Sequence, residues 1–225
     1  MMDALRHSSA HVFVDDVTSP LMSPEDAHHL EKVLRLRNGE TVTCSNGRSA
    51  WRECVWENGS LTILGDVIEV QLPSPALTVV IAPIKGDKTD LVIEKLVEIG
   101  VDHIVVLSPV DHSVVRWPAE KAVQVMARYG RIARAASMQS RRVSLPTLAG
   151  PVSLGSVIGA SVGFAEPGGI AEWSDVTTLV IGPEGGFSSS EVAMAPATIG
   201  LGAGILRAET AAIVGATLMV AHWRG

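Results

Sequence analysis

The chain has 225 residues, of which 47% are hydrophobic, and it carries a formal net charge of −6 at pH 7. This length and composition predict a globular protein with one large domain or two unequal domains. No run of about 18 apolar residues occurs, and the first residues lack the apolar core of a signal peptide, so we expect a cytoplasmic protein with no membrane partner. Cys44 and Cys54 do not have the spacing of a zinc knuckle or a CxxC pair, and we expect two buried thiols.

The segment from Val12 to Val70 consists of short runs in which apolar and polar residues alternate. The runs are separated by turn pairs at Asn38-Gly39, Asn46-Gly47 and Asn58-Gly59. This punctuation is typical of hairpins and predicts a small β-barrel. One helix should interrupt the barrel, because Ser23 is a good capping residue, Pro24 suits the first helical position, and the segment AHHLEKVLRL follows.

Residues 71–75 include two prolines and are interpreted as a linker between domains 1–72 and 73–225. Beyond the linker, strands alternate with helices. In chain order we expect a strand at 77–83, a helix at 88–100 ended by Gly100, a strand at 103–109, a long helix after Pro118, and strands at 143–148, 161–166 and 177–182. This order implies a parallel sheet covered on both faces, with ligands at the C-terminal ends of the strands.

Two glycine-rich turns close the sequence, IGPEGGFS at 181–188 and LGAGILRAETAAIVGA at 201–216. Each is interpreted as a strand, a tight loop and a helix, and together they predict one small-molecule pocket, because glycine exposes backbone groups to a ligand. A third candidate wall is FAEPGG at 164–169. Neither turn is a P-loop or a GxGxxG dinucleotide motif. We therefore expect a neutral or zwitterionic ligand that is held mainly by the backbone.

Residues 116–142 carry a local net charge of +6 within an acidic protein. Arg128, Arg131 and Arg134 are spaced three apart, so they share one broad helix face with Lys121. Such a basic face favours a nucleic-acid partner. The alternative is an ordinary solvated helix face.

Four blocks, in order, resemble the ribosomal RNA small-subunit (16S) uridine N3-methyltransferases of the SPOUT superfamily. The blocks are HHLEKVLRLRNGE, KGDKTDLVIEKLVEIGVDHIVVLSPVDHSVVRW, RAASMQSRRVSLP, and IGPEGGFS with LGAGILRAETAAI. The resemblance covers nearly the whole chain. It implies a small PUA-like β-barrel that helps to bind RNA, then an α/β methyltransferase domain with a parallel sheet and a trefoil knot, a topology that the general rule against knots would exclude. It also implies a homodimer.

The activity that the resemblance implies is methyl transfer from S-adenosylmethionine to N3 of a uridine in small-subunit ribosomal RNA, free or in the 30S particle, with no metal. The implied cofactor-binding residues are Ala165, Glu166, Gly182, Pro183, Glu184, Gly185, Gly186, Leu201, Gly202, Ile205, Leu206, Arg207 and Thr210. The candidate RNA-binding residues are Arg35, Arg37, Arg116, Arg128, Arg141 and Arg142. Two alternatives stay open: methylation of another RNA position, such as a ribose 2′-hydroxyl, and an assembly factor that binds RNA without turnover.

Arg207 and Glu209 are the candidate catalytic residues. A fixed cation at Arg207 could stabilise negative charge on the uracil oxygens as the imide proton leaves. The alternative is that Arg207 pairs with Glu209 or Glu184 and only braces the loops. The two glutamates could act as bases only if burial raised their pKa values, so we expect them to organise the pocket.

Histidines and three departures from the family pattern qualify these assignments. His28, His29 and His112 lack the companion spacing of a metal site and are interpreted as structural or RNA-contacting residues. His11 replaces an arginine, Asp111-His112 replaces Glu-Arg, and residues 138–142 replace Glu-Gln-Ser-Gly-Arg. The lost positive charges affect the expected RNA contacts more than the cofactor loops.

Overall fold

The computed structural model describes residues 2–225, which form two compact units. The first unit consists of the chain up to Leu72 together with Arg134–Leu145, and the second consists of Pro73–Ala133 with Pro146–Gly225. The segment 134–145, which the sequence prediction counts in the second domain, thus packs with the first unit.

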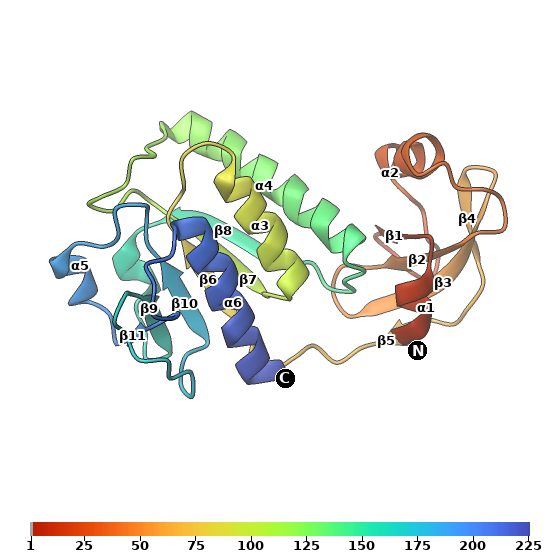
Figure 1. Cartoon of the computed structure of the whole chain (residues 1–225). Coiled ribbons are helices and arrows are strands. Elements are labelled where there is room, and N and C mark those ends of the chain that lie inside the picture. The colour runs from red at the N-terminus through yellow and green to blue at the C-terminus, as the bar shows by residue number, and fades with distance from the viewer. Residues whose placement is uncertain (1) are drawn as a thin grey trace. The chain divides into compact units, whose positions relative to one another are not determined.

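A five-stranded sheet forms the centre of the first unit (Figure 1). Its strands are β1 (Ala10–Phe13), β2 (Thr41–Ser45), β3 (Ala50–Glu57), β4 (Ser60–Ile63) and β5 (Ile68–Glu69). The turns at Asn46-Gly47 and Asn58-Gly59 join antiparallel neighbours, as predicted. The hairpin expected at Asn38-Gly39 is wrong, because β1 and β2 are parallel and the helical segment lies between them in the chain.

The helical segment begins as predicted and ends early. The Ser23 hydroxyl accepts a hydrogen bond of 3.0 Å from the Asp26 amide, which caps α2 (Pro24–His28). A π-helical turn, η1 (His29–Val33), follows. Arg35 then takes a left-handed backbone conformation with φ of 57°, so the predicted helix does not continue through it. The short N-terminal helix α1 (Met2–His7) was not predicted.

The core of the first unit gathers Val12, Leu30 and Trp56 around the sheet. The thiols of Cys44 and Cys54 lie within it on adjacent strands, with their sulfurs 3.7 Å apart. Both cysteines are free and buried, which confirms the prediction of two buried thiols.

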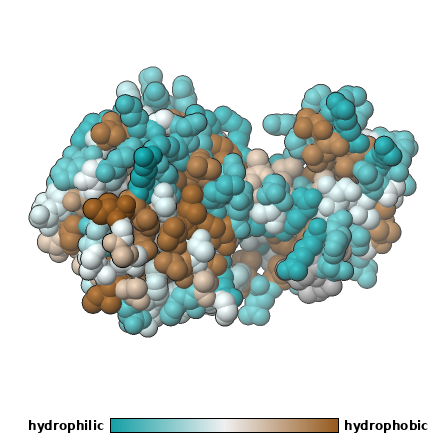
Figure 2. Space-filling model, in the orientation of Figure 1, coloured by the Kyte–Doolittle hydropathy of each residue, from teal (hydrophilic) through white to brown (hydrophobic). Residues whose placement is uncertain are grey.

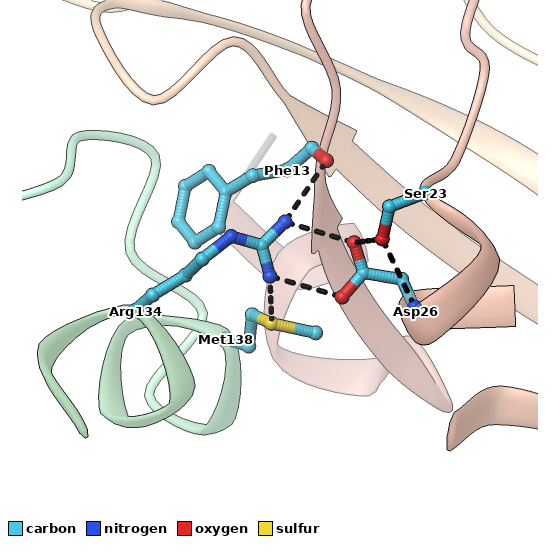
Figure 3. A network of polar contacts seen from close by, with 5 residues as sticks. All are labelled: Phe13, Ser23, Asp26, Arg134 and Met138. Carbon is cyan, nitrogen blue, oxygen red and sulfur yellow. Dashed lines mark hydrogen bonds and ion pairs between the residues drawn. The ribbon is translucent and has the colours of Figure 1, made fainter. Parts of the chain in front are cut away.

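Arg134 is held in the first unit by a network of polar contacts around Asp26 (Figure 3). Its guanidinium donates to both carboxylate oxygens of Asp26, at 2.9 and 2.8 Å, and lies 5.5 Å from the centre of the Phe13 ring. The Ser23 hydroxyl donates to the same carboxylate. The charge of Arg134, which the sequence pattern placed on a basic helix face, is therefore paired with a buried acid.

A six-stranded parallel sheet forms the second unit, in the order β11-β9-β10-β6-β7-β8 (Figure 1). Its strands are β6 (Thr78–Ile81), β7 (His103–Leu107), β8 (Thr147–Val152), β9 (Val162–Ala165), β10 (Thr178–Ile181) and β11 (Ala197–Ile199). The parallel sheet was predicted. The strand expected at 143–148 is wrong by several residues, since Val143 and Leu145 bond to the first unit and β8 begins only after Pro146.

Helices cover both faces of this sheet. On one face α3 (Lys88–Ile99) packs beside α6 (Ala208–Arg224), and α6 also contacts β6 and β10. On the other face Val180 and Phe164 pack with Leu154 of η2 (Leu154–Val157), close to α5 (Ser189–Val192). As predicted, α3 ends at Gly100, whose φ of 105° is left-handed.

The remaining helix, α4 (Ala119–Gln139), confirms the long helix expected after Pro118. Of the helices within residues 2–225, none combines the length and the hydropathy that crossing a bilayer would require.

Candidate cofactor-binding site

The first glycine-rich turn has the predicted order of strand, loop and helix. The loop follows β10, and Ser188 then caps α5 in a reciprocal arrangement with Glu191. The Ser188 amide donates to the Glu191 carboxylate at 2.8 Å, while the Ser188 hydroxyl accepts from the Glu191 amide at 3.3 Å. Phe187 is buried against Phe164, with ring centres 4.8 Å apart. The loop is therefore anchored at its helical end by a cap and by an aromatic contact.

The second turn follows β11 and leads into α6, and the third candidate wall follows β9. The backbones of these two segments touch, since the amides of Glu166 and Ile170 donate to the carbonyls of Ile199 and Thr198, each at 3.0 Å. At Gly169 a β-carbon would lie 2.8 Å from backbone atoms of residues 198–200. Only glycine fits this approach.

All three loops open on one cavity of about 340 Å³. Its lining contains every predicted cofactor-binding residue except Arg207 and Thr210. The predicted residues that line it are Ala165, Glu166, Gly182, Pro183, Glu184, Gly185, Gly186, Leu201, Gly202, Ile205 and Leu206. The cavity is also lined by residues that the list of cofactor-binding residues omits, although they lie within the predicted segments 164–169, 181–188 and 201–216: Pro167, Ile181, Phe187, Gly204, Ala208 and Ala211. These additional residues have apolar side chains or none, so they carried no chemical signal of their own.

The electrostatics of the lining differ between its glutamates. Burial raises the pKa of Glu166 above its usual value. Glu184 lies in the loop after β10, and its carboxylate accepts a hydrogen bond of 2.9 Å from the Lys85 amide. The segment Lys85–Lys88 after β6 thereby braces the loop after β10, as expected of neighbouring parallel strands whose ends meet at one edge.

Glu209, in the first turn of α6, pairs with Lys88 at the start of α3. The Lys88 ammonium lies 2.8 Å from one carboxylate oxygen of Glu209. This hydrogen bond from Lys88 is the main cause that lowers the pKa of Glu209. A carboxylate in that state is a poor proton acceptor, which supports an organising role for Glu209 rather than that of a base.

Arg207 is the N-cap of α6 and its side chain is exposed. Its guanidinium has no hydrogen bond or ion pair with any side chain of residues 2–225, and the carboxylates proposed to hold it, those of Glu209 and Glu184, bind Lys88 and the Lys85 amide instead. The bracing alternative for Arg207 is therefore not the arrangement seen in the structure.

The loop after β7 also contacts the loop after β10. The Asp111 amide donates to Glu191 at 2.9 Å, and Asp111 accepts from the Ser188 hydroxyl at 2.6 Å. The His112 ring lies 3.2 Å from the carbonyl oxygens of Gly185 and Gly186. His112 thus contacts the pocket loop. Residues 2–225 contain no group of three or more His, Cys, Asp or Glu side chains placed to hold a metal ion.

The candidate RNA-binding arginines have unequal environments. Arg128 forms an ion pair of 2.6 Å with Asp90, and the Arg141 guanidinium donates to the carbonyls of Ser8 and Met138. Exposed side chains are found at Arg35, Arg37, Arg116 and Arg131, while Arg142 is half-buried. Binding of RNA by these residues stays a prediction, for which Arg35, Arg37 and Arg116 have the most accessible charge.

Comparison with known proteins places the chain in a family. A model described as "RNA methyltransferase domain" matches residues 71–220, which is most of the chain. The chain belongs to the RNA methyltransferase family. A second model, described as "RNA methyltransferase PUA domain", matches residues 23–57 of this family member. The second match lies within the first unit, whereas the first match covers most of the second unit together with the segment 134–145 of the first.

Curated relatives of this RNA methyltransferase carry the name ribosomal RNA small subunit methyltransferase E, which confirms the predicted family resemblance. The protein from Bacillus subtilis is 25% identical over 227 residues, covering 88% of this chain and 88% of its own. The protein from Mycobacterium tuberculosis is 27% identical over 214 residues, covering 84% and 81%. These alignments cover more than four fifths of both chains.

Solved structures share the fold of the whole chain. A methyltransferase from Legionella pneumophila, solved in complex with the cofactor SAM, has a TM-score of 0.79 at 27% identity and covers 94% of this chain and 97% of its own. Ribosomal RNA small subunit methyltransferase E from Neisseria gonorrhoeae, bound to S-adenosyl methionine, has a TM-score of 0.76 at 23% identity and covers 96% and 98%.

Proposed function

We propose that this protein transfers a methyl group from S-adenosylmethionine to N3 of a uridine in 16S ribosomal RNA of the small subunit. One observation carries the proposal. The three loops that are predicted to bind the cofactor all line the same cavity. Further support comes from the small-subunit ribosomal RNA methyltransferases to which nearly the whole chain is similar.

The cavity fits the proposed cofactor. Its volume falls in the range of about 300–1,000 Å³ that is usual for small-molecule sites, and its lining contains no Lys or Arg side chain. Backbone groups of Gly182–Gly186, Leu201 and Gly202 would hold the polar ends of the ligand, with Glu166 as an acidic neighbour. S-adenosylmethionine supplies an electrophilic methyl group on a sulfonium cation, so a pocket without fixed positive charge suits it.

Residues of the protein then stabilise the negative charge that develops on the uracil ring. N3 of uracil becomes a nucleophile as its proton leaves, and negative charge spreads to the neighbouring carbonyl oxygens. The Arg207 guanidinium, which is exposed and unpaired within residues 2–225, would stabilise that charge. Glu209 would organise the helix start. The target base must be unpaired, because base pairing hides its N3 edge.

The proposal extends to architecture and partners. We propose a PUA-like barrel in residues 1–72, with which 134–145 packs, and a trefoil-knotted SPOUT domain in residues 73–225, for which the parallel sheet is the support. A homodimer is supported by large apolar side chains that are exposed on the second unit, among them Ile205 beside the cavity at 87%. Figure 2 shows apolar surface gathered over the second unit around α6. Ribosomal RNA as substrate implies a cytoplasmic location.

A methyl-transfer assay with product identification tests the activity. The protein is incubated with labelled S-adenosylmethionine and either 30S particles or naked 16S RNA, and the modified nucleoside is isolated. We expect N3-methyluridine. A 2′-O-methyl nucleoside as sole product would instead support the other RNA position. Calorimetric titration with S-adenosylmethionine addresses the assembly-factor alternative, because absence of binding would leave the cavity without its proposed ligand.

A further inference from the structure

We propose that Lys88 is a positioning residue for Arg207. Lys88 forms an ion pair with the Glu209 carboxylate, and this pairing keeps the Arg207 guanidinium available to the RNA substrate. The inference rests on the proposed function, since it concerns the residue expected to stabilise charge on the uracil. It assigns a role to an ion pair that lies beside the cavity lining and not within it.

Glu209 is the carboxylate expected to compete with the RNA substrate for the Arg207 guanidinium. The two residues are separated by one position at the start of α6, and the charge of Arg207 contributes to the lowered pKa of Glu209. The second carboxylate oxygen of Glu209 is buried and has no hydrogen-bond partner within residues 2–225. A half-buried carboxylate with one oxygen left without a partner is stabilised by the nearest available cation. Without Lys88, that cation is Arg207.

The location of Lys88 supports this reading. Lysine at the first position of a helix opposes the positive end of the helix dipole, and Asp87, the N-cap of α3, makes no side-chain capping hydrogen bond. Residues that break a local rule of this kind commonly have a functional reason. The ion pair to Glu209 across the packed pair of helices α3 and α6 supplies one.

The other acid of the glycine-rich loops is engaged in the same way. Glu184 accepts a hydrogen bond from the Lys85 amide, so the segment Lys85–Lys88 binds both carboxylates that the sequence analysis considered as partners for Arg207. Because the Glu184 contact uses a backbone amide, substitution of the Lys88 side chain leaves it in place. The effect of such a substitution can therefore be assigned to Glu209.

A set of charge variants tests the proposal through rescue. Lys88→Met should lower the single-turnover rate of methyl transfer at least about tenfold while the cofactor Kd changes by less than about threefold. Lys88→Met/Glu209→Gln should transfer faster than Lys88→Met, because the competing charge is gone. Lys88→Arg should retain activity. Lys95→Met is the matched control, since Lys95 pairs with Glu94 and Glu98 on the same helix.

A second measurement does not depend on activity. In ¹⁵N NMR of the full-length protein, the Arg207 side-chain N–H should exchange rapidly with water in the wild type and become protected in Lys88→Met, then return to rapid exchange in the double variant. Unchanged exchange in Lys88→Met, or a double variant as slow in methyl transfer as the single one, would overturn the inference. Wild-type protein without methyl transfer but with the expected exchange pattern would count against the proposed function only.

Discussion

The guanidinium of Arg134 binds both carboxylate oxygens of Asp26, and the pair joins the end of α4 to the start of α2 within the first unit (Figure 3). Asp26 is only 5% exposed, and Arg134 forms an ion pair with it. Two parallel hydrogen bonds to one carboxylate make a geometrically specific contact. Arg134 therefore has a structural function in a segment that its charge pattern marked as a nucleic-acid surface.

We predict that Arg134→Met lowers the free energy of unfolding by roughly 2–4 kcal/mol, because it leaves the buried Asp26 carboxylate unpaired. Urea denaturation followed by circular dichroism measures the change. The control is Arg131→Met, whose side chain is exposed on the same helix, and which should stay within about 0.5 kcal/mol of wild type. Equal stability of both variants would contradict the role given to the Asp26 pair.

Gly169→Ala should destabilise the second unit by roughly 1–3 kcal/mol, since the new β-carbon would overlap backbone atoms of residues 198–200 that cannot rotate away. Gly204→Ala is the matched control. A β-carbon there meets nothing within 4 Å, so its stability should equal or slightly exceed that of wild type. Thermal unfolding of both variants checks the difference, and a Gly169→Ala protein as stable as the control would refute the close backbone approach.

His11 should make the stability of the protein depend on pH between about 4 and 6.5. Burial first, and the charge of Arg141 second, lower the pKa of His11 from 6.5 to about 4 in the folded state. Above pH 6.5 the ring is neutral in both folded and unfolded chains, so its contribution is constant. As the pH falls through this window, the unfolded chain takes up a proton that the folded chain excludes, and stability decreases by up to roughly 3 kcal/mol.

The measurement is the difference in unfolding free energy between wild type and His11→Gln at several pH values. Using the difference removes the contribution of other titrating groups. The wild type should lose stability relative to the variant as the pH falls from 6.5 toward 4. An NMR titration offers a direct check, because a His11 ring that titrates near pH 6.5 would show that it is not held neutral by its surroundings.

Arg207→Ala should reduce kcat/KM for methyl transfer about 10²–10³-fold, the usual effect of removing one group that stabilises developing charge. The Kd for S-adenosylmethionine should change by less than about threefold, since Arg207 does not line the cavity. Kinetics and calorimetry on the same preparations provide the comparison. Equal losses in transfer and in cofactor affinity would indicate that Arg207 shapes the loops instead.

Arg116→Ala and Arg128→Ala should differ in their effect on RNA binding. Arg116 is exposed, whereas Arg128 is paired with Asp90 and has part of its charge already neutralised. If Arg116 contacts a phosphate, its loss makes the negative slope of log K against log salt shallower by about 1. The loss of Arg128 should change this slope less. Filter binding of 16S RNA at several salt concentrations tests this. A larger effect of Arg128→Ala than of Arg116→Ala would show that Arg128, and not Arg116, contacts the RNA.

Features fixed by neighbouring residues were predictable from the sequence. Gly100 ends α3, Ser188 caps α5 and Ser23 caps α2, because each signal acts within one helical turn. The cavity walls were predictable for a related reason: glycine-rich loops at the ends of parallel strands converge on one edge of the sheet. The family resemblance supplied the proposed ligand, which the glycines alone did not specify.

Features that join distant residues were not predictable in this way. Arg134 and Asp26 are 108 positions apart, and nothing local in either helix indicates the partner. The pairing of Lys88 with Glu209 depends likewise on α3 and α6 lying side by side. The parallel pairing of β1 with β2 was missed because turn residues report a change of direction, and not which strand comes next to which.

The position of β10 in the sheet has a consequence for synthesis of the protein. In sheet order β10 lies between β9 and β6, and its Thr178 is in register with Thr78 of β6. In a nascent chain that ends before β10, β6 can pair with β7 and β7 with β8. The backbone groups on the other edge of β6, which bond to β10 in the folded protein, then have no partner strand. Unpaired edges invite association between chains. We therefore expect translation pauses just upstream of β10 to be the stage at which this protein most needs protection from aggregation.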